Sequence, residues 1–340
     1  MQWTAVPCAP EPGLLSEGPV WDAHRQELLW VDITAGLIHR GALIARADGT
    51  GPPDVAPLCT LTLDRPVGAV APCASGDLIA AAGTGFLTVG ATGRAAPFAA
   101  PSLPSDGVRR RMNDAKCDPR GRLLAGTMAY DITPGAGSLH RLDPDGSVAT
   151  LLDSVTISNG LGWSPDGRRL YFADSATHRV DVFDYDPPSG ALGSRRPFAR
   201  FGADEEPDGL AVDTEGRVWV AVWGAGQVRA FAPDGTPYAV VDVPAAHVSS
   251  CAFAGPDLDV LVITTAREGR SPEQLRAEPD AGRLFVCRPG ATGLPIAPFA
   301  DAPAPAPAST PAPRPVPTGP ADPAAAPGPT TAHDQQGAPS

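Results

Sequence analysis

The chain has 340 residues, with 26 basic against 38 acidic side chains and a formal net charge of -12. This acidity argues against nucleic acid and against anionic membranes as partners, because both bind clusters of positive charge. No window holds the roughly 18 apolar residues of a membrane span, and no basic stretch followed by an apolar core opens the chain, so we expect a cytoplasmic protein.

An N-terminal strand around residues 3–6 precedes a body whose short apolar segments end in Asp-Pro, Pro-Asp-Gly and other glycine-rich turns. Such segments are typical of an all-β protein. One pattern then recurs every 41–50 residues: a first position that is usually polar, alternating apolar residues, a turn and a second apolar run. Its six copies begin at Glu17, Val67, Asn113, Asn159, Asp208 and Ser249.

A third strand, which usually starts with glycine, and a fourth short apolar run follow each copy. The third strands occupy residues 36–40, 85–89, 137–141, 178–183, 226–231 and 282–286. Four strands in each of six repeats predict an all-β, six-bladed β-propeller. A β-sandwich with coincidental turns is the alternative, although a sandwich has no reason to repeat one strand order at a fixed spacing.

The sixth copy leads into a segment of different character. We expect one short helix near residues 272–277, and we expect the N-terminal strand to complete the last blade near residues 295–299. From residue 302 the composition is mostly Pro, Ala, Thr and Gly without a hydrophobic period, and such a segment buries too little surface to offset its ordering entropy. We therefore predict a propeller domain at residues 1–301 and a disordered, solubilising Pro/Ala-rich tail at residues 302–340.

Cysteine and lysine usage gives little sign of special chemistry. None of the six cysteines stands in Cys-x-x-Cys spacing, so the sequence predicts neither a zinc knuckle nor a thioredoxin-like redox site. Without an export signal we expect reduced, mostly buried thiols. Lys116 is the only lysine, and we interpret this scarcity as a bias of genome composition.

The first strand of each propeller blade lines the central channel, so the six repeat positions are expected to form a ring. Apart from Val67, the ring carries two carboxylates, two amides and a hydroxyl. Buried oxygens need partners, and oxygen ligands without His or Cys suit calcium, magnesium or manganese, although zinc and iron(II) also accept carboxylates. A water-filled channel whose side chains bond one another is the alternative.

Motifs in four separate blades are similar to those of a known family. They are Leu15-Ser-Glu-Gly-Pro-Val-Trp, Arg111-Met-Asn-Asp, the stretch from Asp118 to Gly-Thr-Met128, Ile157-Ser-Asn-Gly-Leu-Gly-Trp and Pro207-Asp-Gly-Leu-Ala-Val-Asp. Over residues 12–300 the chain resembles the gluconolactonase/regucalcin (senescence marker protein) family. That resemblance implies a six-bladed propeller that hydrolyses sugar lactones with one divalent metal ion in its channel.

The same resemblance implies roles for individual residues. It makes metal ligands of Glu17, Asn159 and Asp208, which are three of the ring positions. It makes substrate contacts of Arg111 and Asn113, and of a family glutamate shortly after Gly-Thr-Met, whose place is taken here by the shorter Asp131. The expected cofactor is one divalent cation, calcium or zinc first, with magnesium, manganese and iron(II) left open.

Opening a lactone requires a polarised carbonyl and an activated water molecule. We expect Asp208 to accept the proton of the attacking water; direct attack by Asp208 on the carbonyl is the alternative. The guanidinium of Arg111 and the amide of Asn113 suit sugar hydroxyls. The leading hypothesis is therefore a metal-dependent, gluconolactonase-like hydrolase of a sugar lactone, without an obligatory protein partner. A hydrolase of other esters or phosphoesters and a non-catalytic calcium-binding scaffold are the competing hypotheses.

Overall fold

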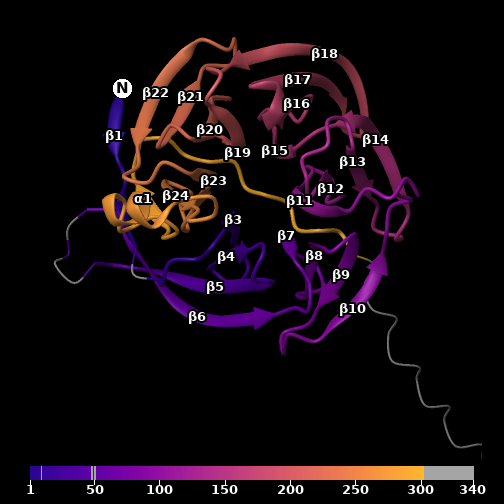
Figure 1. Cartoon of the computed structure of the whole chain (residues 1–340), viewed down its shortest axis with the longest axis horizontal. Coiled ribbons are helices and arrows are strands. Elements are labelled where there is room, and N and C mark those ends of the chain that lie inside the picture. The colour runs from indigo at the N-terminus through magenta and orange to yellow at the C-terminus, as the bar shows by residue number, and fades with distance from the viewer. Residues whose placement is uncertain (9, 47–48, 50, 302–340) are drawn as a thin grey trace, which may run out of the picture. The chain divides into compact units, whose positions relative to one another are not determined.

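Six β-sheets stand around a central axis, each running from an innermost to an outermost strand (Figure 1). The computed structural model describes residues 1–8, 10–46, 49 and 51–301. Within these residues the predicted six-bladed propeller is confirmed. The predicted tail at residues 302–340 lies outside the described residues.

The first three blades are each built from four consecutive antiparallel strands. The first blade contains β3 (Ser16–Asp22), β4 (Glu27–Asp32), β5 (Leu37–Ile44) and β6 (Asp54–Thr62). The second contains β7 (Val67–Pro72), β8 (Leu78–Ala82), β9 (Gly85–Val89) and β10 (Ala95–Ala99). The third contains β11 (Arg110–Cys117), β12 (Leu123–Ala129), β13 (Gly137–Leu142) and β14 (Val148–Val155).

The last three blades repeat this order, and the fifth and sixth also take a strand from the N-terminus. The fourth contains β15 (Ser158–Trp163), β16 (Arg169–Asp174), β17 (Arg179–Asp186) and β18 (Ala191–Arg200). The fifth contains β19 (Glu206–Val212), β20 (Val218–Trp223), β21 (Gln227–Phe231) and β22 (Pro237–Asp242). The sixth contains β23 (Val248–Ala254), β24 (Val260–Thr265) and β25 (Phe285–Cys287).

Strands from the N-terminus close the ring. β2 (Val6–Pro7) pairs antiparallel with β25 as the outermost strand of the sixth blade, and β1 (Gln2–Thr4) pairs parallel with β22 at the edge of the fifth. The expected pairing with residues 295–299 is wrong, because two prolines in that segment have no N–H to offer a strand ladder.

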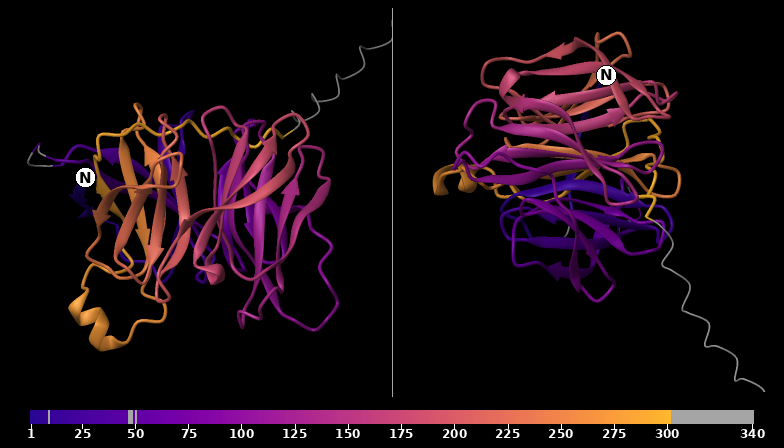
Figure 2. Two further views of the ribbon diagram at one scale, coloured as in Figure 1. Left: turned by 90° about the horizontal axis from the view of Figure 1, so that it is seen from above. Right: turned by 90° about the vertical axis from the view of Figure 1, so that its right-hand side faces the viewer.

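The segment at residues 292–300 instead crosses one face of the propeller, and α1 protrudes from the other face (Figure 2). Its backbone joins opposite sides of the ring: the N–H of Leu294 donates to the carbonyl of Val212 at 3.3 Å, and that of Phe299 donates to Pro72 at 2.8 Å. The end of the propeller domain therefore covers one mouth of the central channel.

Apolar side chains from facing blades pack into one cluster at each blade interface. Between the fifth and sixth blades, for example, the rings of Trp219 and Phe253 meet edge to face with centroids 5.8 Å apart. Burial of this kind supplies the main favourable term in folding. The polar residues that face the axis lie on the innermost strands, inside these apolar clusters.

Every innermost strand carries a β-bulge at its ring position. Pairing with the second strand is interrupted between residues 17 and 20, 67 and 69, 112 and 115, 158 and 161, 207 and 210, and 248 and 250. A bulge bends a strand and re-aims its side chains, and bulges are common beside functional sites. The repeat thus places one irregular backbone element in each blade at the level where the ring residues lie.

Glycine follows the ring residue in four blades, at Gly18, Gly68, Gly160 and Gly209. A Cβ atom on Gly209 would lie 2.8 Å from the Cα of Ser250 in the next blade, and one on Gly160 would lie 3.0 Å from the Leu210 nitrogen. Both distances are too short for ordinary contacts. Absence of a side chain here lets neighbouring innermost strands approach, which brings ring residues from different blades together.

The expected short helix is confirmed as α1 (Pro272–Ala277). Its start carries a reciprocal cap in which the Ser271 hydroxyl accepts from the Gln274 N–H at 3.2 Å and the Gln274 side chain accepts from the Ser271 N–H at 2.8 Å. A second, 3-10 helix covers Ser175–Thr177. Neither helix of the described chain has the length and apolarity required to cross a membrane.

All six cysteines lie in the described part of the chain without disulfide bonds, and every one except Cys59 is buried. Burial raises the pKa of the Cys251 thiol to about 12, which keeps that sulfur in the unreactive thiol form. The cysteines therefore have the mostly buried, unpaired arrangement that the sequence led us to expect.

Candidate functional site

Two carboxylates from separate blades face the channel. Glu17 on β3 and Asp208 on β19 are each only 6% exposed. Burial, followed by the charge of Asp114, raises the pKa of the Glu17 carboxyl from its ordinary 4.5 to about 8. Burial, followed by the charge of Glu17, raises the pKa of Asp208 well above its usual range. Two acids that resist ionisation in this way indicate a site that is short of positive charge.

Asp208 has a buried oxygen that lacks a partner within the described chain. Its Oδ1 atom is buried and has no hydrogen-bond partner among the described residues, whereas Oε2 of Glu17 accepts the Gly18 N–H at 2.9 Å. A buried, unpaired carboxylate oxygen is costly, and a divalent cation would satisfy it. The described ranges contain no group of three or more His, Cys, Asp or Glu side chains placed to hold a metal ion, so any third protein ligand would be an amide, a hydroxyl or a backbone carbonyl.

Asn159 on β15 has the orientation that such an amide ligand needs. Its Nδ2 donates to Ser175 Oγ at 2.7 Å, and that hydroxyl donates to the Pro207 carbonyl at 2.7 Å, next to Asp208 in the chain. Its Oδ1 accepts from Asn113 Nδ2 at 2.6 Å. The amide oxygen is thereby directed away from Ser175, and it retains a lone pair for a ligand.

Arg111 and Asn113 on β11 extend this hydrogen-bonded chain. The Nη1 group of Arg111 donates to Asn113 Oδ1 at 2.5 Å and to the Met112 carbonyl at 3.0 Å. Arg111 is buried, and burial lowers its pKa, while the charges of Glu268 and other acidic groups, Glu17 and Asp208 included, act in the opposite direction. The guanidinium is therefore one of two counter-charges that β11 brings to Glu17, the other being Lys116.

Five of the six residues singled out in the sequence thus lie in one neighbourhood, and Asp131 does not. Asp131 is exposed, and its Oδ1 accepts from the backbone and hydroxyl of Thr133 at 3.2 and 2.7 Å. The charge of Tyr130, its neighbour in the chain, acts on Arg111 instead. Tyr130 follows the end of β12, and the Arg109 guanidinium lies over its ring, 4.7 Å from the centroid.

Sequence reasoning also missed two other charged groups. Asp114 directly follows Asn113, is buried, and its charge raises the pKa of both Glu17 and Asp208. Asp114 follows the ring residue in the bulge of β11, a position where four other blades have glycine. An acidic residue in place of glycine could have marked Asp114 as a candidate from the sequence. Glu268 lies in the connection after β24, outside the repeated pattern, and gave no signal in the sequence.

We expect the protein in EDTA to lose stability as the pH rises from 5 to 8. Glu17 keeps its proton up to about pH 8 in the folded chain, whereas its ordinary pKa is 4.5. The folded state therefore binds more protons than the unfolded state across this range, and its free energy of unfolding falls by up to about 1.4 kcal/mol per pH unit.

Thermal unfolding at pH 5, 6.5 and 8 measures this effect. The Glu17→Gln variant is the control, because an amide does not titrate, and its unfolding temperature should fall less steeply with pH. Calcium or zinc added at pH 8 should restore stability to the original chain. Equal slopes for the two proteins would contradict the raised pKa of Glu17.

Comparison with known proteins identifies the family of this chain. Residues 15–267 match the family described as SMP-30/Gluconolactonase/LRE-like region. Regucalcin from Gallus gallus is 38% identical over 294 residues, which cover 84% of this chain and 95% of that protein. Regucalcin from Homo sapiens is 36% identical over 301 residues, which cover 86% of this chain and 96% of that protein.

A solved structure extends the similarity to the fold. The calcium-binding protein regucalcin from Agrobacterium tumefaciens superimposes with a TM-score of 0.78 at 28% sequence identity, covering 88% of this chain and 98% of its own. The matched family region includes the first strand of every blade and all five of the clustered residues. The chain therefore belongs to the SMP-30/gluconolactonase/regucalcin family.

Proposed function

We propose that this protein is a metal-dependent hydrolase that opens a sugar lactone to the aldonic acid. The observation that carries the proposal is the buried pair of Glu17 and Asp208, in which one carboxylate oxygen has no partner among the described residues. Family membership supports lactone hydrolysis, and the calcium-binding relative from Agrobacterium tumefaciens supports a divalent ion.

Glu17, Asn159 and Asp208 would hold the ion, with calcium or zinc as the first candidates. When bound, a divalent cation polarises the lactone carbonyl and lowers the pKa of a bound water molecule. These ligands come from three blades, so the ring itself sets their spacing. A hydrogen bond donated to Ser175 and another accepted from Asn113 hold the Asn159 amide in one orientation, which keeps the ligand set in place before an ion arrives.

Asp208 is the residue that moves the proton. Its carboxylate accepts a proton as the water oxygen attacks the lactone carbonyl carbon, and it returns that proton to the ring oxygen when the carbon–oxygen bond of the ring breaks. Burial favours the protonated acid, so the carboxylate is an effective base once it is ionised. The products are the aldonic acid and the regenerated carboxylate, without a change of oxidation state.

Arg111 binds and orients the lactone. Within the described chain its only hydrogen bonds run from Nη1, which leaves Nε and Nη2 as donors for sugar oxygens. Asn113 uses its oxygen on Arg111 and its nitrogen on Asn159 and on the Ser158 carbonyl. In this proposal Asn113 therefore positions both neighbours, in addition to offering its remaining lone pair to substrate.

A panel of aldonolactones, aryl esters and phosphotriesters, assayed by proton release, tests the proposal. We expect aldonolactones to be opened, EDTA to abolish turnover, and one added divalent cation to restore it. Metal binding without turnover of any substrate would favour the calcium-binding scaffold, and turnover of the other esters alone would favour the broader hydrolase.

Glu17→Gln should lower metal-dependent turnover by at least about 100-fold, because it removes a charged ligand. Glu27→Gln is the matched control: Glu27 lies on the same blade but forms an ion pair with Arg40 at 2.6 Å, away from the channel face. Turnover of the Glu17 variant within threefold of the original at limiting metal would contradict its role as a ligand.

A further inference from the structure

The central channel has a cavity at the end away from Arg111, which the proposed reaction does not use. Arg111 and Asn113 lie at the start of β11, whereas Lys116 and Cys117 lie at its end and line a cavity of about 440 Å³. The ends of β15 and β19 line it as well, through Trp163 and Val212 among others. The cavity therefore lies toward the opposite end of the innermost strands from Arg111, while the charge of Lys116 still acts on Glu17.

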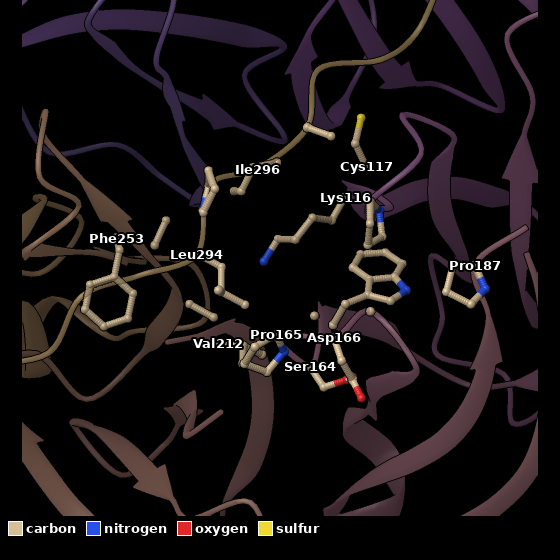
Figure 3. Close-up of a pocket in the computed structure, with 18 residues that line it drawn as sticks. Lys116, Cys117, Ser164, Pro165, Asp166, Pro187, Val212, Phe253, Leu294 and Ile296 are labelled. Atoms are coloured by element: carbon tan, nitrogen blue, oxygen red, sulfur yellow. The ribbon is translucent and has the colours of Figure 1, made fainter. Parts of the chain in front are cut away.

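The segment that crosses this mouth of the channel roofs the cavity. Leu294 and Ile296 contribute apolar side chains, and Phe253 and Val212 contribute others from the innermost strands (Figure 3). One acidic residue, Asp166, lies in the lining, and its carboxylate is engaged by the Ser164 hydroxyl at 2.6 Å and the Arg168 N–H at 3.0 Å. The walls are thus shaped for an apolar body of modest size.

Lys116 brings a positive charge into this apolar space. Its side chain extends from the strand end into the cavity (Figure 3). Its Nζ donates to the Leu210 carbonyl at 2.5 Å, which is its only hydrogen-bond acceptor among the described residues. An ammonium group has three donors, so two remain for a ligand. Burial lowers the pKa of Lys116, while the charges of Asp114, Cys251 and Glu17 act in the opposite direction.

We propose that this cavity binds a small apolar monocarboxylate, whose hydrocarbon body fills the space under Leu294 and Ile296 and whose carboxylate accepts hydrogen bonds from Lys116. A charge-assisted hydrogen bond in a dry pocket is stronger than one in water. An uncharged apolar molecule would leave two Lys116 donors unsatisfied, and a sugar would leave its hydroxyls against apolar walls. Binding here does not depend on whether the protein opens lactones.

Calorimetric titration of the full chain with 2-naphthoate and with 2-naphthamide tests this site. The two probes share one aromatic body, and only the first carries a charge. We expect 2-naphthoate to bind at least tenfold more tightly. Lys116→Met should abolish that difference, and Leu294→Trp, which fills the cavity, should weaken binding of 2-naphthoate at least tenfold. Leu58→Trp, an exposed position on β6, is the matched control.

A second measurement needs no variant, because Lys116 is the only lysine of the chain. Saturating 2-naphthoate should slow acetylation of Lys116 by an amine-reactive reagent severalfold, with the N-terminal amine as internal reference in the same mass spectrum. Equal affinity for the two probes, unchanged binding in Leu294→Trp, or an unchanged acetylation rate would each overturn the proposed site. None of these readouts uses lactone turnover, so failure here and failure of the proposed reaction are distinguishable.

Discussion

Replacing Asp208 by asparagine should lower kcat/KM for lactone opening by at least about 1,000-fold at saturating metal. An amide cannot accept the proton of the attacking water, and loss of a general base alone costs about 100- to 10,000-fold. The side chain keeps its size, and Asp208 has few other obligations, because its Oδ1 has no hydrogen-bond partner among the described residues. Fold and stability should therefore survive the change.

Two controls separate proton transfer from simple loss of the ion. Asp184→Asn changes an exposed carboxylate on β17 that pairs with Arg196 at 2.9 Å, and it should leave turnover unchanged. Calorimetric metal binding to the Asp208 variant shows how much of the loss comes from weaker affinity, since an amide oxygen can still ligate. A variant that binds metal and retains more than a tenth of the original turnover would exclude Asp208 as the base.

Gly209→Ala should lower the free energy of unfolding by about 3 kcal/mol, the upper part of the range for overpacked cores. Its Cβ atom would overlap the side chain of Ser250 and lie 2.8 Å from the Ser250 Cα. Both residues belong to innermost strands, where neighbouring blades are closest, so the clash is relieved only by spreading the channel. Activity should fall as well, because spreading separates Asp208 from its partners.

Chemical unfolding monitored by circular dichroism measures the loss, and Gly90→Ala is the control. A Cβ atom at Gly90 would have no neighbour nearer than 3.8 Å, so that variant should unfold within about 0.5 kcal/mol of the original. Adding Ser250→Gly to Gly209→Ala removes part of the obstruction and should restore part of the stability. Equal stability of Gly209→Ala and Gly90→Ala would contradict the close approach of the blades.

The repeat made most of this architecture predictable. A fixed spacing of apolar strands and turns identified the blades, and reading one position through all six copies placed Glu17, Asn159 and Asp208 in one ring with three other residues. The resemblance to a known family then singled out these three as metal ligands. The same reading explains why Arg111 and Asn113 lie beside them, since β11 is the innermost strand of its blade. A feature that recurs in every blade can be recognised in the sequence, because each of the six copies has the same strand order and the same spacing.

What lay outside the repeat was not predictable in this way. Asp131 was chosen by its place shortly after the Gly-Thr-Met motif, and in the structure its carboxylate bonds to Thr133. The segment at residues 295–299 was expected to pair as a strand, but its prolines prevent this. Lys116 was attributed to genome composition, and only the channel shows that its side chain reaches an apolar cavity.

Pairing of β2 with β25 joins the beginning of the polypeptide to its last sheet. During synthesis, β2 must wait for nearly the whole propeller to emerge before β25 is available. The pairing that completes the sixth sheet therefore forms late in cotranslational folding. A circular permutant that starts between β22 and β23 would carry β23, β24, β25 and β2, the strands of the sixth sheet, in the first part of its chain. Such a chain would complete the sixth sheet early, although β1 would then wait for β22, and comparing its refolding rate with that of the natural order would measure the cost of the late β2–β25 pairing.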